Sequence, residues 1–87
     1  MDAREVVLAL LTARAPGATI CPSEAARALA AADPAVVNAD WREAMPTVHA
    51  AVDRLIAEGL VRLSWKGQPL AARAGPYRIG RDRADER

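Results

Sequence analysis

Apolar positions recur at helical spacing near the start of the chain. The run Val6–Leu11 lies in a segment that begins at Asp2 and stops before the Pro16–Gly17 pair. Its apolar positions cover a broad face rather than a narrow stripe, which is typical of a helix that is buried on several sides. The pattern predicts a helix from Asp2 to about Arg14, and it predicts that this helix is the most buried of the chain.

A second helix is predicted from Pro22 to about Ala31. Proline suits the first position of a helix because the N–H that it lacks would have no partner there. The preceding stretch, Ala18–Ile20, is partly β-branched and favours a short strand. The stretch after the helix, Asp33–Ala39, is predicted to be a loop.

Pro46 divides the third helical region, since proline is not tolerated in the interior of a long helix. We expect a short turn over Trp41–Met45 and then a helix over Pro46–Glu58, with Gly59 as its C-terminal cap. The apolar positions at core spacing are Met45, Val48, Val52, Leu55 and Ile56.

After Gly59 the hydrophobic period changes from helical to alternating, as in a half-buried strand. The residues on the apolar side are Val61, Leu63 and Trp65. Turn signals follow at Lys66–Pro69 and Gly75–Pro76, and Tyr77–Ile79 is predicted to be the returning strand. A lone hairpin is marginal in water, so we expect it to pair with the strand near Ile20 and form a three-stranded sheet.

This order of elements predicts an α+β fold of the winged-helix type. The expected architecture is a three-helix helix-turn-helix core, a short strand between the first two helices, and a C-terminal β-hairpin that forms the wing. The domain is expected to span residues 1–80. Residues 81–87 are almost all charged and are predicted to be a disordered tail.

Composition excludes several classes of protein. Cys21 is the only cysteine and His49 the only histidine among the 87 residues, so the chain has no disulfide of its own and no conventional zinc site. The apolar run near the N-terminus is too short for a signal peptide, and no stretch has the length of a membrane span. We therefore expect a cytoplasmic protein that has no membrane partner.

The charge is unevenly distributed along the chain. The net charge of +1 divides into −3 over residues 1–59, +5 over residues 60–81 and −1 over residues 82–87. Such asymmetry is typical of a surface that faces a polyanion. It is equally typical of a short exposed hairpin that arginines keep soluble, and the sequence leaves both interpretations open.

The third helix is a weak candidate for reading DNA sequence. Its face opposite the core stripe carries Ala50, Arg54 and Ala57, flanked by Thr47 and Asp53. Arg54 is the one strong contact for a base or a phosphate there, and Asp53 would repel a phosphate. Further residues that read base edges are absent from this face. It therefore suits close approach to a backbone, or a flat contact with a protein.

The predicted wing supplies the best candidates for binding nucleic acid. Arg62 and Arg78 fall on outward positions of neighbouring strands, where like charges are unfavourable unless an anion bridges them. If about four phosphates were neutralised, the logarithmic salt dependence of binding would have a slope of about −3 to −4. The candidate nucleic-acid-binding residues are Thr47, Arg54, Arg62, Trp65, Lys66, Arg73 and Arg78.

Four other conspicuous residues are expected to have structural roles. His49 lies at the edge of the buried stripe and should make a local hydrogen bond. Trp41 should pack under the third helix. Trp65, beside the wing turn, is expected to cover the edge of the core, with stacking on a base as the alternative. Cys21 is expected to be a small buried residue.

The chain is not expected to be an enzyme. It has no nucleophile motif, no phosphate-binding glycine loop and no pair of carboxylates suited to acid–base chemistry. The acids near the starts of the helices are explained by their favourable interaction with helix N-termini. We accordingly expect no cofactor and no metal.

Five segments together resemble a short bacterial family of winged-helix-like proteins whose function is unassigned. They are Thr19–Leu29, Asp40–Pro46, Arg54–Gly59, Lys66–Pro69 and Gly75–Ile79. The resemblance extends from about Arg4 to Ile79. It implies the winged-helix fold and no particular activity. The chain lacks the small cysteine-rich module of some members, and its loop from Asp33 to Ala39 is longer than is usual.

Two functions are compatible with these features. The first is a nucleic-acid-binding accessory protein or transcription regulator that grips double-stranded DNA through a basic wing. The alternative is a winged-helix module that binds a protein partner or forms a homodimer, through the Ala50, Arg54 and Ala57 face or through Trp65. The charge distribution favours the first, and the weak third helix is the main argument against it.

Overall fold

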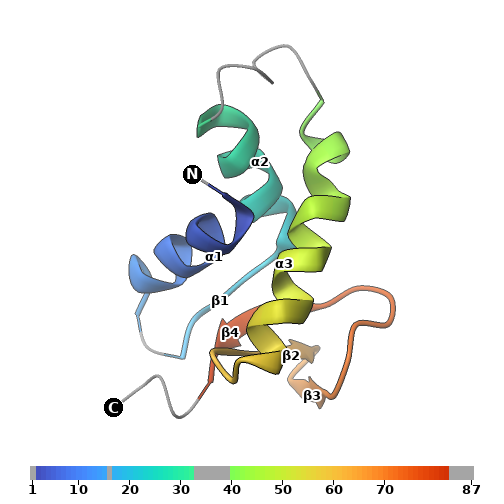
Figure 1. Cartoon of the computed structure of the whole chain (residues 1–87). Coiled ribbons are helices and arrows are strands. Elements are labelled where there is room, and N and C mark those ends of the chain that lie inside the picture. The colour runs from blue at the N-terminus through green and yellow to red at the C-terminus, as the bar shows by residue number, and fades with distance from the viewer. Residues whose placement is uncertain (1, 16, 33–39, 83–87) are drawn as a thin grey trace.

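The chain folds into helices that lie on one side of an antiparallel sheet (Figure 1). The structure, a computed structural model, describes residues 2–15, 17–32 and 40–82. The helices in these ranges are α1 (Ala3–Thr12), α2 (Pro22–Ala32), the 3₁₀ helix η2 (Trp41–Ala44) and α3 (Met45–Ala57). The strands are β1 (Thr19–Ile20), β2 (Val61–Trp65), β3 (Gln68–Leu70) and β4 (Arg78–Arg81). The expected α+β class is confirmed, whereas the predicted loop at Asp33–Ala39 lies outside the described residues.

Local sequence signals account for most of the helix boundaries. Asp2 caps α1, because its Oδ1 accepts a hydrogen bond of 2.8 Å from the backbone N–H of Glu5. Pro46 lies in the first turn of α3, where its missing N–H costs nothing. Gly59 ends this helix with φ +74°, and Leu60 N–H donates to the carbonyl of Leu55, which is the Schellman arrangement. The predicted cap is thereby confirmed.

The sheet has one strand more than expected. Its order is β1-β4-β2-β3, and every neighbouring pair is antiparallel. The residues Gln68 and Pro69, predicted to belong to a turn, pair with Trp65 and Ser64 in the edge strand β3. The prediction was wrong because the turn needs only two residues. Lys66 (φ 51°) and Gly67 (φ 81°) both adopt the positive φ that a two-residue hairpin of type I′ requires.

The sheet also extends beyond residue 80, where the domain was expected to end. Arg81 belongs to β4, and its guanidinium donates to the carbonyl of Leu11, 2.6 Å away, at the C-terminal end of α1. The N–H of Asp82 donates to the carbonyl of Leu60. These two residues are therefore part of the folded domain, while residues 83–87 lie outside the described ranges.

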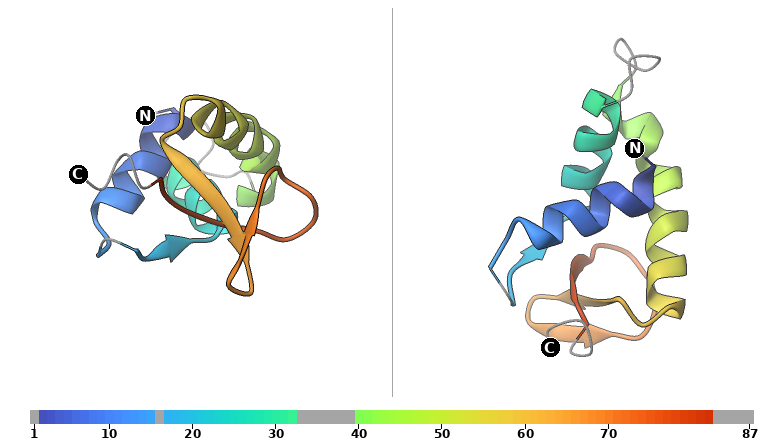
Figure 2. Two further views of the ribbon diagram at one scale, coloured as in Figure 1. Left: turned by 90° about the horizontal axis from the view of Figure 1, so that it is seen from below. Right: turned by 60° about the vertical axis from the view of Figure 1, so that its left-hand side comes forward.

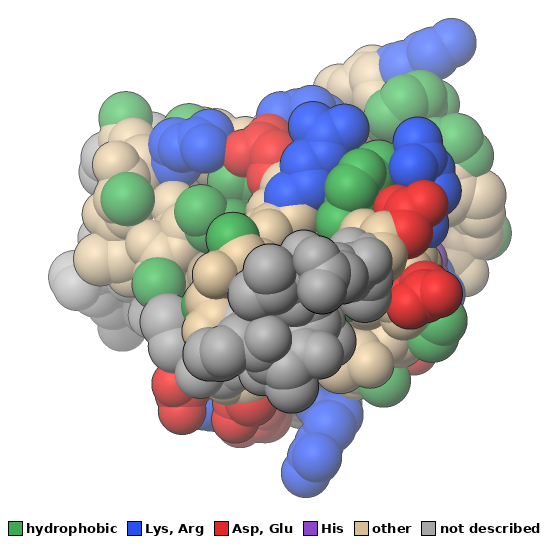
Figure 3. Space-filling model, turned by 90° about the horizontal axis from the view of Figure 1, so that it is seen from above, with side chains coloured by type: hydrophobic (Ala, Val, Ile, Leu, Met, Phe, Trp, Pro, Cys, Tyr) green, Lys and Arg blue, Asp and Glu red, His purple; other side chains and the backbone are tan. Residues whose placement is uncertain are grey.

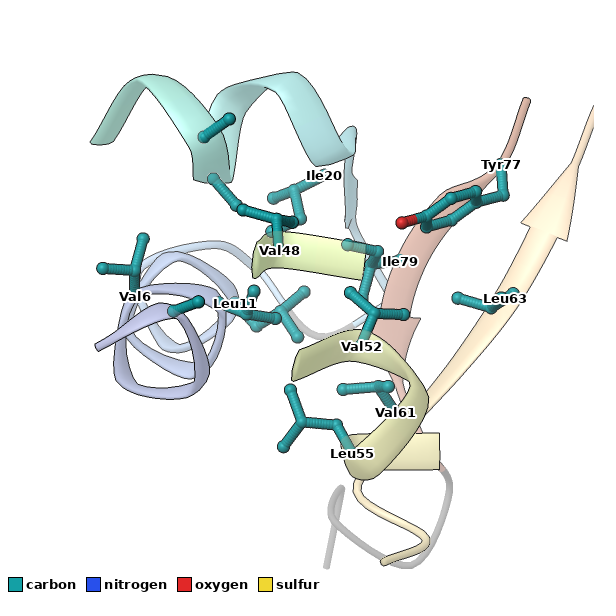
Figure 4. Close-up of a cluster of buried hydrophobic side chains, with 14 residues drawn as sticks. Val6, Leu11, Ile20, Val48, Val52, Leu55, Val61, Leu63, Tyr77 and Ile79 are labelled. Atoms are coloured by element: carbon teal, nitrogen blue, oxygen red, sulfur yellow. The ribbon is translucent and has the colours of Figure 1, made fainter. Parts of the chain in front are cut away.

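The core lies between the inner face of the sheet and the three α-helices (Figures 2 and 4). Its largest fully buried side chains are Ile20, Leu55, Leu63, Ile79, Val7, Val48, Val52 and Val61. Helix α1 contributes Ala3, Val6, Val7 and Leu11, four buried residues against two from α2 and three from α3. Among the described residues, none of the helices is both long enough and apolar enough to cross a membrane.

Candidate nucleic-acid interface

Strand register places five residues together on the side of the sheet that faces away from the core. Ser64 pairs with Arg78, Arg62 pairs with Gly80, and Gly80 also pairs with Thr19. Paired residues of an antiparallel sheet share a face, and this face alternates with the buried positions Val61, Leu63 and Ile79. We call the surface formed by Thr19, Arg62, Ser64, Arg78 and Gly80 the outer face.

Two of the candidate arginines lie on this outer face as diagonal neighbours. Arg62 is opposite Gly80, two residues along β4 from Arg78. Such a diagonal separates the β-carbons by about 7–8 Å. The Arg78 guanidinium is held in place by β1: its Nε–H donates to Thr19 Oγ1 at 2.6 Å and its Nη2 to the Thr19 carbonyl at 3.1 Å. Their predicted outward placement on neighbouring strands is confirmed.

A hollow of about 290 Å³ lies over the outer face at Gly80. It exists because Gly80 has no side chain between Thr19 on one strand and Arg62 on the other. The residues that line it are Gly17, Thr19, Arg62, Leu63, Ser64, Gly67, Pro69, Gly80 and Arg81. Two of these lining residues are arginines, two carry hydroxyl groups, and none is acidic.

Arg73 is not available to the outer face. The loop between β3 and β4 passes beside α3 (Figure 1). There the guanidinium of Arg73 makes a two-pronged ion pair with Asp53, with contacts of 2.7 and 2.8 Å. This hydrogen bonding lowers the pKa of the Asp53 carboxyl. The pair cancels the phosphate-repelling charge expected of Asp53, but it also removes Arg73 from the group of cations that share one surface.

Thr47 and Arg54 lie on a different surface. Both are exposed on α3, beside the N-terminal end of α1, where they line a hollow of about 270 Å³ with Ala50, Ala51 and the start of α1. An ion pair between Arg4 and Glu58, 2.9 Å apart, joins the two helices nearby. The sheet packs against α3 with its inner face, so these two residues and the outer-face arginines cannot bind one phosphate together.

Trp65 was expected to cover the edge of the core, and this prediction was wrong. It falls on the same side of β2 as Val61 and Leu63, but the residue is 38% exposed. Trp65 lines an open hollow of about 320 Å³ with Met45, His49, Pro76 and other residues. Lys66 follows at the tip of the β2–β3 turn and is exposed.

The structure also places Cys21 and Trp41. Cys21 is half-buried rather than buried, and its Sγ lies 3.0 Å from Ser23 Oγ. Trp41 packs against the core with part of its ring, and the guanidinium groups of Arg27 and Arg42 lie 4.7 and 4.6 Å from the ring centre. Its partners thus come from α2 and η2 as well as from the neighbourhood of α3.

His49 makes a tertiary hydrogen bond instead of a local one. Its Nδ1 lies 2.6 Å from the hydroxyl of Tyr77, which is 28 residues further along the chain. The Tyr77 hydroxyl is directed toward α3 at the edge of the core (Figure 4), and burial raises its pKa to about 12. With Tyr77 protonated and His49 neutral, the tautomer of the imidazole sets which of the two groups donates. Burial, with a smaller contribution from Arg73, lowers the pKa of His49 below its usual 6.5.

The burial of His49 leads to an expected pH dependence of stability. Because the pKa of His49 is lower in the folded chain than in the unfolded chain, protonation favours unfolding. The contribution of His49 is present above pH 6.5 and is lost as the pH falls through its folded pKa. We expect the melting temperature to decrease between pH 7.5 and pH 5, and the decrease to be smaller in His49→Gln. An equal decrease in that variant would contradict the assignment.

The end of the molecule opposite the sheet differs from the outer face in how its charged side chains are arranged. Seen from that end, basic and acidic side chains are interspersed (Figure 3). Asp40 and Arg42 form one such pair, 3.1 Å apart. Surfaces with alternating charge present little net potential to a polyanion. The outer face is therefore the better candidate for a nucleic-acid interface.

Sequence alternation was sufficient to place Arg62 and Arg78 but not the rest of the outer face. The hydroxyls of Thr19 and Ser64 and the small Gly80 were missed. The sequence did indicate that Ser64 faces away from the core, since it alternates with the apolar Val61 and Leu63 in the same way as Arg62. Thr19 belongs to a strand some 60 residues away from β4, and only the β1–β4 register brings it to Gly80.

Comparison with known proteins identifies the family of the chain. A search of curated proteins gives no match. The sequence model of a family described as protein of unknown function (DUF3253) matches residues 2–82, which is nearly the whole chain. The chain therefore belongs to this family, protein of unknown function (DUF3253).

Proposed function

We propose that the protein is a winged-helix, nucleic-acid-binding accessory protein or regulator of the bacterial cytoplasm, which holds the backbone of double-stranded DNA through its basic wing. The order helix, short strand, helix, helix and hairpin supports the winged-helix assignment. In this assignment α3 corresponds to the recognition helix, and β2, β3 and β4 form the wing. The protein acts by binding and not by catalysis.

The observation that carries the proposal is the composition of the outer face. Arg62 and Arg78 share it, Lys66 extends it at the hairpin tip, and none of the described residues that line the hollow is acidic. A strand rises about 3.3 Å per residue, so Arg62 is about 10 Å along β2 from Trp65, the residue before Lys66. Phosphates on one DNA strand repeat about every 3.4 Å along the helix axis. The cations thus span several phosphates of a duplex.

Binding of this kind is expected to be backbone-directed and independent of base sequence. The exposed side of α3 offers small residues, Ala50 and Ala57, where base-reading side chains would be needed. Phosphate contacts position a protein on DNA without specifying sequence. An accessory role, in which another molecule supplies specificity, fits this surface better than sequence-specific repression.

The salt dependence of duplex binding tests the proposal. Arg73 is held beside α3 by Asp53 and lies away from the outer face, so we count three cations on or next to that face instead of four: Arg62, Lys66 and Arg78. The logarithm of the association constant should therefore fall with the logarithm of salt concentration with a slope of about −2 to −3. The measurement is fluorescence anisotropy of a labelled random-sequence duplex at several salt concentrations. Absence of saturable binding at low salt would rule out the proposed function.

A protein-binding module is the second candidate. The observation that favours it is the hollow of about 270 Å³ between α1 and α3, whose walls include Ala3, Ala50 and Ala51. Small side chains permit close approach of another helix. If this face forms a homodimer, sedimentation velocity will show association that depends on protein concentration, is lost in Ala50→Glu and is retained in the double variant Arg62→Glu, Lys66→Glu.

A further inference from the structure

We propose that the hollow over Gly80 is a seat for one tetrahedral phosphate group. This inference deepens the proposed function, on which it rests for the source of the ligand: a phosphodiester of the DNA backbone. The same chemistry would also accept the phosphate of a small phosphorylated molecule, and the experiment below separates the two sources.

The floor of the seat is the backbone of Gly80, which carries no side chain. Gly80 is buried and lies between Thr19 and Arg62 in register. A β-carbon added to it would lie 3.3 Å from Thr19 Cγ2, which is a tight contact. Any side chain at this position would therefore crowd Thr19 and occupy the space in which we place the phosphate. Its backbone φ is not in the left-handed region, so conformational need does not explain the glycine.

The walls of the seat carry hydrogen-bond donors. Thr19 Oγ1 accepts a hydrogen bond from the Arg78 Nε–H, so the proton of this hydroxyl remains to be donated to another group. Ser64 contributes a second hydroxyl and Arg62 a guanidinium. The two hydrogen bonds from Arg78 to Thr19 also fix the position of its positive charge beside the hollow. A bound anion would meet donors from three strands.

The donor set favours phosphate over a carboxylate. Guanidinium groups recognise phosphate through parallel N–H donors, and the bonds are stronger because both partners are charged. A phosphodiester has two charged oxygens, as a carboxylate has, but its four oxygens form a tetrahedron and can face donors on several sides, whereas a carboxylate accepts mainly in its own plane. The volume of about 290 Å³ lies near the lower limit for ligand sites. It suits a phosphate with the adjoining sugar and not an extended ligand.

The test follows backbone amide signals of the ¹⁵N-labelled chain by NMR. One titration uses a random-sequence duplex of about 12 base pairs, and a second uses inorganic phosphate. With the duplex, we expect the Thr19, Ser64 and Gly80 signals to shift more than those of α3. With inorganic phosphate, the same three signals should shift at millimolar concentration.

Single variants test whether the side chains that line the seat contribute to the affinity for the duplex. Ser64→Ala removes one donor to a charged group and should weaken duplex binding about three- to tenfold. Ser64→Thr keeps the hydroxyl and suits a strand, so it should retain the wild-type affinity. Thr12→Ala removes an exposed hydroxyl from α1 instead, where it donates to the carbonyl of Leu8, and should change the affinity less than twofold. Melting temperatures of the three variants verify that each is folded.

The outcomes separate the seat from the proposed function. If the duplex binds without moving the Gly80 signal, and Ser64→Ala binds like wild type, the seat is refuted and the proposed function stands. If the duplex does not bind but inorganic phosphate moves the same signals, the seat stands and its ligand is a small phosphorylated molecule. If the duplex does not bind and inorganic phosphate shifts none of these signals, both proposals are refuted.

Discussion

Replacing Ile79 with alanine is expected to lower the free energy of unfolding by about 2–5 kcal/mol. Ile79 is fully buried in β4, and its register partners are Ile20 on one side and Leu63 on the other. Truncation therefore leaves a cavity where the sheet meets the helices (Figure 4). Urea unfolding followed by circular dichroism measures the loss.

The effect should be large because the domain is small. Domains of this size have a total stability of about 4–13 kcal/mol, so the substitution should remove a large fraction of it. Ile56→Ala provides the matched control, since this isoleucine lies only partly buried at the edge of the core and should lose less. Equal losses in the two variants would contradict the central position that we assign to Ile79.

Reversing two charges on the wing is expected to weaken duplex binding at least about 100-fold at low salt. In the double variant Arg62→Glu, Lys66→Glu, two of the three expected phosphate contacts are lost and each is replaced by repulsion. Both side chains are exposed, so the fold should be retained. Anisotropy with the labelled duplex measures the affinity, and the salt dependence of the residual binding should become much shallower.

A second double variant tests whether position or net charge is responsible. Arg27→Glu with Arg42→Glu changes the net charge by the same amount but acts around Trp41, away from the sheet. We expect its duplex affinity to fall by less than about tenfold, through long-range repulsion alone. If the two double variants lose affinity equally, the outer face has no special role, and the proposal that the wing binds DNA is refuted.

Local features of the structure could be predicted because they depend on neighbours in the sequence. Asp2, Pro46 and Gly59 mark helix ends through caps and missing N–H groups that need no distant partner. The alternation after Gly59 likewise placed Val61 and Leu63 inside and Arg62 outside, because successive side chains of a strand point to opposite faces.

The candidate site depends on contacts between distant segments, and its prediction was only partly correct. Arg73 was grouped with Arg62 by charge alone, although the loop that carries it turns toward Asp53 on α3. Trp65 obeys the same alternation as Leu63, yet it is 38% exposed and lies beside an open hollow. Periodicity specifies a face of an element and does not specify how far the opposing layer reaches.

The sequence by itself determined the helices, the alternation of the main strand and the excess of basic residues after Gly59, since each follows from residues that are close in the chain. Only the tertiary structure decided which of those cations share a surface. The β1–β4 register brings Thr19 to Gly80 and Arg78, and the ion pair with Asp53 withdraws Arg73. Both contacts join segments that no local propensity couples, so they exist only once the sheet has packed on the helices.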